Sequence, residues 1–195
     1  MPLTALDPTT ALVVIDLQNG ILATPGTPHA TSEVLQRTVT LADVFRSHGL
    51  PVVLVLVTAA PDGSDSTPGR TDAAPLVQNP PAGWDKVSDA LAGHPQDITV
   101  TKRNWGAFYG TDLDLQLRRR NVTQIVLTGA ATSIGVESTA RAAHEHGYHV
   151  TVVTDAVTDM DADAHRNSVE KIFPRLGETG TTAEVLELLA KTHAG

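Results

Sequence analysis

The sequence contains no cysteine, which excludes disulfide bonds, thiolate metal sites and a catalytic thiol. Basic residues are few: 14 lysines and arginines stand against 22 acidic residues, and the net charge of −8 argues against a nucleic-acid surface. No apolar run approaches the roughly 20 residues that a membrane-spanning helix needs. The first ten residues lack the basic region and apolar core of a signal peptide. We therefore expect a cytoplasmic protein that binds neither nucleic acid nor membrane.

The length of 195 residues suits one domain, and no repeat or linker divides residues 1–195. Strand-like apolar runs alternate with helix-like stretches. Strands are expected at 11–16, 52–57, 98–101, 125–127 and 150–153. Helices are expected from Ser32 to Gly49, at 87–91, at 162–173 and at 182–190. Two more are expected, one that begins after a capping Asp112 and one that ends at Gly147. The helix from Ser32 has an apolar stripe of Leu35, Val39, Ala42 and Phe45. Because the strands are nearly all apolar, they predict a parallel sheet covered on both faces.

Three positions follow the ends of separate predicted strands. Asp16 ends the first strand, Lys102 ends the third, and Gly135 lies in the small-residue turn after the strand at 125–127. Open α/β sheets bind ligands beyond the carboxyl ends of their strands. A tight turn that opens a helix also aims backbone N–H groups at one point, which suits an anion or a developing oxyanion. We expect these three residues to share one site.

The turn sequence GAATSIGVESTAR at 129–141 resembles the active-site turn of the isochorismatase-like hydrolases, the cysteine hydrolase superfamily. The segments VIDLQNG around Asp16 and TKRNWGAFYGTDL around Lys102 are similar to two further motifs of that family. The resemblance covers nearly the whole chain and implies a Rossmann-like three-layer α/β/α sandwich with a six-stranded, mainly parallel sheet. It also implies a cis peptide bond between Ala130 and Ala131 and a homodimer or larger homo-oligomer. We expect no cofactor.

Most members of this family place a nucleophilic cysteine where the chain has Gly135. The resemblance assigns the catalytic acidic residue and lysine to Asp16 and Lys102. Isochorismatase-type members also carry glycine at the nucleophile position and cleave a vinyl ether without a protein nucleophile. That chemistry makes Asp16 a general acid, whose raised pKa apolar burial can provide. Lys102 would orient the substrate carboxylate, and the N–H groups of Ala131 and Gly135 remain as donors. Gly20 departs from the acidic residue that the family has there.

Three functions remain open for this site. One is hydrolysis of a small carboxylated enol ether without a thiol. Another is amide or ester hydrolysis with water or Ser133 in place of the thiol, and the third is binding of a small acid or partner without catalysis. Ser133 and Thr132 are more simply turn formers, because no histidine stands at a recognisable spacing to activate them. The candidate substrate contacts are Gln18, Trp105, Phe108, Ala131 and Thr132, although either aromatic side chain also suits the core.

Two clusters have the look of metal sites, but neither predicts one. The first has the spacing of a calcium loop but carries Ala164 where the turn demands glycine, and helix capping explains it equally well. It comprises Asp159, Asp161, Asp163 and Glu170. In the second, His144 and His146 lie two apart on a helix and face different ways, and His149 follows them. We expect no metal.

Residues 58–81 lack periodicity and read as a long loop that is functional or mobile.

Overall fold

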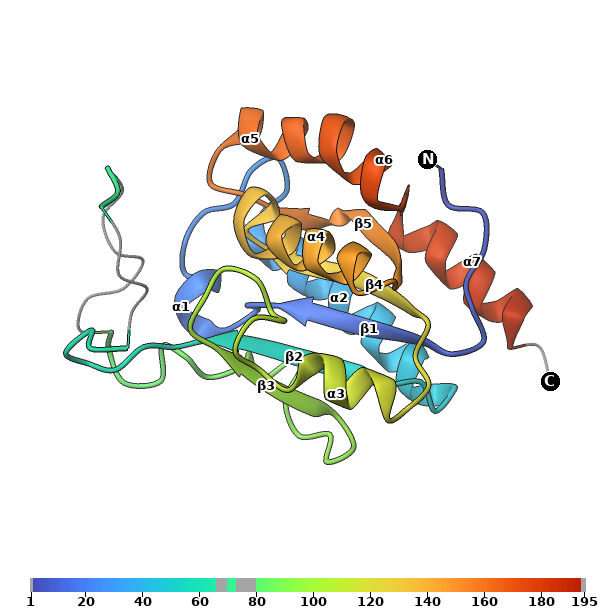
Figure 1. The fold of residues 1–195 in the computed structure, drawn as a ribbon, viewed down its shortest axis with the longest axis horizontal. Coiled ribbons are helices and arrows are strands. Elements are labelled where there is room, and N and C mark those ends of the chain that lie inside the picture. Colours follow the sequence, from blue (N-terminus) through green and yellow to red (C-terminus); the bar gives the residue numbers. More distant parts are fainter. Residues whose placement is uncertain (1, 66–69, 73–79, 194–195) are drawn as a thin grey trace.

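A single sheet of six parallel strands forms the middle of the fold (Figure 1). The computed structural model describes residues 2–65, 70–72 and 80–193. The strands are β1 (Thr10–Ile15), β2 (Val52–Val57), β3 (Ile98–Lys102), β4 (Gln124–Ala130), β5 (His149–Thr158) and β6 (Glu178–Gly180). Their order is β3-β2-β1-β4-β5-β6, and each pair of neighbours is parallel. The first strand, β1, therefore lies in the middle of the sheet, and the strand order reverses between β1 and β4.

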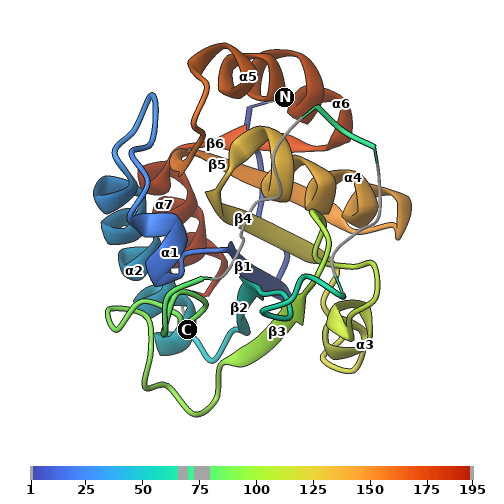
Figure 2. The same ribbon diagram turned by 90° about the vertical axis from the view of Figure 1, so that its left-hand side faces the viewer.

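Helices cover both faces of this sheet (Figure 2). On one face lie α2 (Thr31–Ser47) and α7 (Thr182–Thr192). On the other lie α3 (Leu113–Arg118), α4 (Glu137–Glu145), α5 (Ala162–Asn167), the π-helical turn η2 (Ser168–Ile172) and α6 (Phe173–Leu176). Because side chains of a strand alternate between faces, Val13 of β1 packs into one apolar cluster and Leu12 and Val14 into the other. The expected three-layer sandwich is confirmed.

Several helix ends follow from local sequence. Asp161 begins α5, where its carboxylate accepts the backbone N–H groups of Asp163 and Ala164 at 2.8 and 3.0 Å. The helix-capping interpretation of this acidic stretch is thus confirmed for Asp161. After α4, Gly147 has a φ of +83°, a left-handed conformation that glycine adopts without strain, and it ends the helix as expected.

Other expectations about helices were met only in part or were wrong; of the stripe expected in α2, Ala42 and Phe45 are buried. In α2 the buried stripe is Val34, Thr38, Leu41, Ala42 and Phe45, whereas Leu35 and Val39 are only partly buried. Residues 87–91 form no helix, because Val87 instead makes an antiparallel bridge with Gln18. Asp112 precedes α3 but makes no capping bond, since its carboxylate accepts from the side chain of Gln116 at 2.7 Å.

The chain after β4 also differs from expectation. Strand β5 continues to Thr158, past the predicted end at 153, because a register shift in β4 between Leu127 and Gly129 lets the pairing resume. The predicted helix at 162–173 is present as a helical stretch without a gap, in which α5, η2 and α6 follow one another and reach Leu176. The expected loop at 58–81 falls partly on residues 66–69 and 73–79, which lie outside the described residues.

Candidate active site

The core of the site is a buried ion pair at the carboxyl edge of the sheet, the side that faces the viewer in Figure 2. Asp16 follows β1 directly, and Lys102 is the last residue of β3. Lys102 reaches past the end of the intervening β2 and places its Nζ 2.8 Å from Oδ2 of Asp16. The two side chains are only 2% and 7% exposed, respectively. Asp16 also has a φ of +54°, an uncommon conformation for a residue other than glycine.

Asp16 holds its proton more strongly than an ordinary carboxyl group does. Burial raises the pKa of Asp16 from 3.8 to about 6, and the neighbouring Lys102 ammonium opposes that rise without cancelling it. The carboxyl oxygen Oδ1 is buried and has no hydrogen-bond partner among the described residues. A carboxylate with so few donors is poorly stabilised away from water, and this explains why desolvation prevails over the ion pair.

Gly135 faces this ion pair from the turn between β4 and α4. It lies in the π-helical turn η1 (Thr132–Val136). A Cβ placed on Gly135 would lie 3.2 Å from Oδ2 of Asp16 and 3.0 Å from Cγ2 of Ile15. Gly135 therefore packs closely against the Asp16 carboxyl, with little room for a side chain between them. The structure brings Asp16, Lys102 and Gly135 into one place, and the peptide bond between Ala130 and Ala131 just before the turn is cis.

A hydrogen-bonded chain ties this turn to the segment after Lys102. The Thr139 hydroxyl of α4 donates to the carbonyl of Gly135 at 2.7 Å and accepts the N–H of Ala107 at 3.1 Å. The carbonyl of Trp105 lies 3.5 Å from the Cβ position of Gly135. Trp105 thus borders the site through its backbone, while its indole is 66% exposed.

Two of the expected substrate contacts have structural partners instead. The Gln18 amide is fully buried and forms two bonds to the backbone of Val57: its Nε2 donates to the carbonyl at 2.9 Å and its Oε1 accepts the N–H at 2.8 Å. Phe108 is buried and stacks on the His146 ring, with 5.0 Å between the centroids. The structure therefore gives Gln18 a role in fixing the end of β2 and Phe108 a place in the core.

Thr132 has a partner that its sequence spacing does not reveal. Its hydroxyl lies 2.9 Å from Nδ1 of His165, which is 33 residues further along the chain, and Thr132 has no exposed surface. The sequence analysis found no histidine at a recognisable spacing from this turn, and tertiary contact supplies His165. Ala131, the other expected contact in the turn, is half-buried, and its carbonyl accepts the N–H groups of Ile134 and Val136.

Gly20, which departs from the family motif, has a steric explanation. A Cβ at Gly20 would lie 1.9 Å from Nε1 of Trp84, so the indole fills the space that a side chain would need. The backbone of Trp84 also accepts the N–H of Gly20 at 2.8 Å. Glycine at position 20 therefore lets the 81–87 segment close against the chain that follows Asp16.

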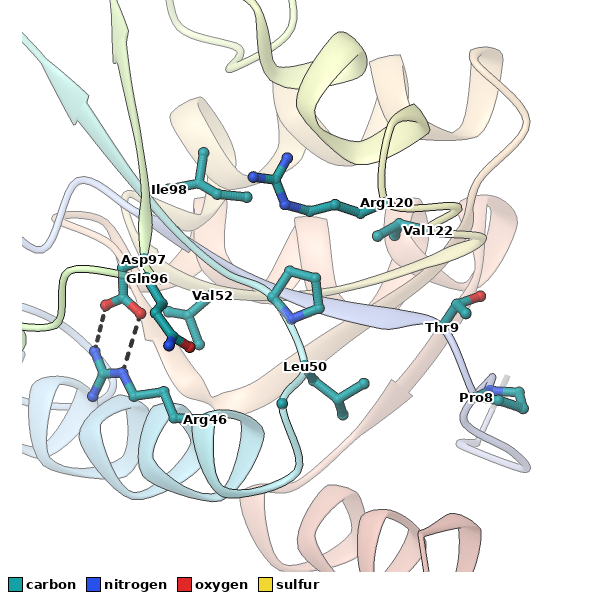
Figure 3. Close-up of a pocket in the computed structure, with 12 residues that line it drawn as sticks. Pro8, Thr9, Arg46, Leu50, Val52, Gln96, Asp97, Ile98, Arg120 and Val122 are labelled. Atoms are coloured by element: carbon teal, nitrogen blue, oxygen red, sulfur yellow. Dashed lines mark hydrogen bonds and ion pairs between the residues drawn. The ribbon is translucent and has the colours of Figure 1, made fainter.

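A separate cavity of about 530 Å³ opens at the opposite, amino-terminal edge of the sheet (Figure 3). Its wall includes Arg46, whose Nη2 lies 2.7 Å from Oδ2 of Asp97. Arg120 reaches over the same hollow. None of Asp16, Lys102 and Gly135 lines this cavity. Within the described chain, no group of three or more histidine, aspartate or glutamate side chains is arranged to hold a metal ion, and no described helix has both the length and the apolarity to cross a membrane.

The chain is similar to known proteins over most of its length. The isochorismatase domain family matches residues 10–184. The chain belongs to the isochorismatase family. The isochorismatase family protein YecD from Escherichia coli O157:H7 is 46% identical over 93% of this chain and 96% of its own length.

Two further proteins are similar to this chain over most of its length. A solved isochorismatase family structure from Burkholderia thailandensis is 49% identical, covers 95% of this chain and 97% of its own, and has a TM-score of 0.91. The ureidoacrylate amidohydrolase RutB from Methylobacterium radiotolerans is 31% identical over 98% of this chain and 85% of its own length.

Proposed function

We propose that this isochorismatase-family protein is a hydrolase that works without cysteine and cleaves a small carboxylated enol ether, with Asp16 as the general acid. The observation that carries the proposal is the state of Asp16. It is a buried carboxyl group with a pKa raised to about 6, and the residue facing it, Gly135, offers no nucleophile. An acid works best when its pKa lies near the operating pH, and Asp16 meets that condition.

The reaction begins with the carboxyl proton of Asp16. Asp16 transfers it to the methylene carbon of the enol ether, and the adjacent carbon becomes part of an oxocarbenium ion. Water adds to that ion and returns a proton to Asp16. The resulting hemiketal breaks its carbon–oxygen bond and yields pyruvate and an alcohol. One water molecule is consumed, and Asp16 ends in the state in which it began.

Lys102 supplies the positive charge that such a substrate requires. When Asp16 is protonated, the Lys102 ammonium is a buried cation without an ionised partner, and a substrate carboxylate offsets that charge. Lys102 also keeps a bond to the carbonyl of Asn104 at 3.2 Å, which holds the ammonium in place. The N–H groups of Ala131 and Gly135 are the donors proposed for negative charge on the substrate.

Amide hydrolysis is the second candidate, and the similarity to RutB favours it. In this reaction a water molecule would replace the thiol, and ionised Asp16 would accept its proton. The two functions demand opposite protonation states of the same residue. General-acid catalysis by Asp16 falls as pH rises through about 6, whereas general-base catalysis rises over the same interval.

The test is pyruvate release from isochorismate and related enol ethers, measured as kcat/KM against pH. We expect release that declines above pH 6, and a loss of kcat of about 10² to 10⁴ in Asp16→Asn with little change in KM. The matched control is Asp97→Asn, which also breaks a buried ion pair but at the other edge of the sheet. Its kcat per folded molecule should stay unchanged. Asp16→Asn activity within about threefold of the parent removes Asp16 from the mechanism.

A further inference from the structure

The segment from Asp159 to Ser168 forms hydrogen bonds with Thr132 and Ser133, two consecutive residues of the turn that contains Gly135. The Oδ2 atom of Asp159 accepts the backbone N–H of Ser133 at 2.7 Å. Beside it, Nδ1 of His165 meets the Thr132 hydroxyl at 2.9 Å. Asp159 and His165 are 4% and 7% exposed, and the contact between His165 and Thr132 is buried.

The same segment also forms a hydrogen bond with the first residue of α4. The Ser168 hydroxyl donates to Oε2 of Glu137 at 2.6 Å, and Glu137 is the residue at which the turn becomes α4. Contacts at 132, 133 and 137 therefore bracket Gly135 from both sides. The position of Gly135 relative to Asp16 depends on where this segment lies.

His165 is the one histidine among these contacts, beside the carboxyl groups of Asp159 and Glu137. Burial lowers the pKa of His165 below 6.5, the nearby His29 lowers it further, and Asp159 acts in the opposite direction. His29 meets the ring edge-on, with 6.2 Å between centroids. A neutral imidazole has one donor and one acceptor nitrogen, whereas the protonated ring has two donors and a positive charge. Protonation thus changes the bond to Thr132 and adds a charge beside His29.

We propose that His165 is a positioning residue: in its neutral form it holds, through Thr132, the turn that places Gly135 against Asp16. His165 touches no substrate in this arrangement. The kinetic part rests on the proposed function, because it needs turnover, but the structural part does not. Under both proposals the pH profile has two limbs. Activity is lost toward acid pH as His165 gains a proton and toward alkaline pH as Asp16 loses one.

Three variants separate these effects. His165→Asn keeps a hydrogen-bonding group near the place of Nδ1 but does not titrate, so it should retain kcat near neutral pH and lose only the acid limb. His165→Leu removes the bond and should lower kcat about 10- to 100-fold, because small misplacements near a reacting group cost that much. Thr132→Val breaks the same bond from the other side and should match His165→Leu. Should His165→Leu fail to fold, Thr132→Val carries the comparison.

Amide hydrogen exchange at residues 131–137, measured by NMR at pH 7, gives a readout that needs no substrate. We expect faster exchange in His165→Leu and Thr132→Val, and wild-type exchange in His165→Asn. If the parent releases no pyruvate, the proposed function fails, and exchange alone decides the role of His165. Wild-type exchange at 131–137 in both His165→Leu and Thr132→Val overturns the proposal. An acid limb that persists unchanged in His165→Asn overturns it as well.

Discussion

The substitution Lys102→Met tests how burial and ion pairing together set the pKa of Asp16. Methionine has a similar unbranched shape, so the change removes the charge 2.8 Å from Asp16 and leaves the site filled. Lys102 lowers the pKa of Asp16, whereas burial raises it. An opposite charge at this range lowers a carboxyl pKa by about 1 to 3. Removing it should therefore raise the pKa of Asp16 from about 6 to about 7–9.

The same numbers predict how stability depends on pH. The folded-state pKa of Asp16 lies above its unfolded value of 3.8, so protonation of Asp16 favours the folded state. That contribution is complete below pH 3.8 and is lost as pH rises through about 6. A difference of about two pKa units corresponds to about 3 kcal/mol. In Lys102→Met this stabilising contribution persists to higher pH, because Asp16 stays protonated and so avoids an unpaired buried charge.

Carboxyl titration by NMR, with carbon-13-labelled aspartate, measures these values directly and requires no substrate. Lys191→Met is the matched control, because Lys191 makes the same kind of contact, 2.6 Å to Glu187, on an exposed helix surface. The control should leave the Asp16 titration unchanged. A wild-type Asp16 that titrates near 3.8, or a pKa that does not rise in Lys102→Met, refutes the reasoning.

Three further predictions concern the same region. Gly135→Cys should not raise turnover of an enol ether, because its Cβ would crowd Oδ2 of Asp16 at 3.2 Å; a gain in steady-state kcat would instead favour amide hydrolysis. The double variant Asp16→Leu/Lys102→Met should be inactive yet neutral or more stable by about 1–4 kcal/mol in denaturant unfolding, and a large destabilisation would contradict this. Gly20→Ala should lower unfolding free energy by about 1–3 kcal/mol, whereas the control Gly106→Ala, with contacts of 3.4 Å, should change it little.

The sequence by itself determined the framework of the site. Apolar runs such as 52–57 could only be buried strands, and the carboxyl ends of parallel strands meet at one edge of a sheet. That argument places Asp16, Lys102 and the Gly135 turn together, and the 2.8 Å ion pair of Asp16 and Lys102 agrees with it. These features depend on neighbours within a few residues along the chain, which a sequence pattern records.

Contacts between distant residues were decided only by the tertiary structure. His165 reaches Thr132 across 33 residues, and Gln18 bonds to Val57 across 39, so no spacing within one element predicts either contact. The extension of β5 to Thr158 likewise depends on a register shift in its neighbour.

The protonation of Asp16 shows this division most clearly. A neighbouring Lys102 ammonium favours an ionised Asp16 carboxylate, whereas apolar burial favours a protonated one. The two effects have opposite signs, so the depth of burial and the number of hydrogen bonds decide between them. In the folded protein Asp16 is almost wholly buried and its Oδ1 has no partner among the described residues, and desolvation therefore prevails.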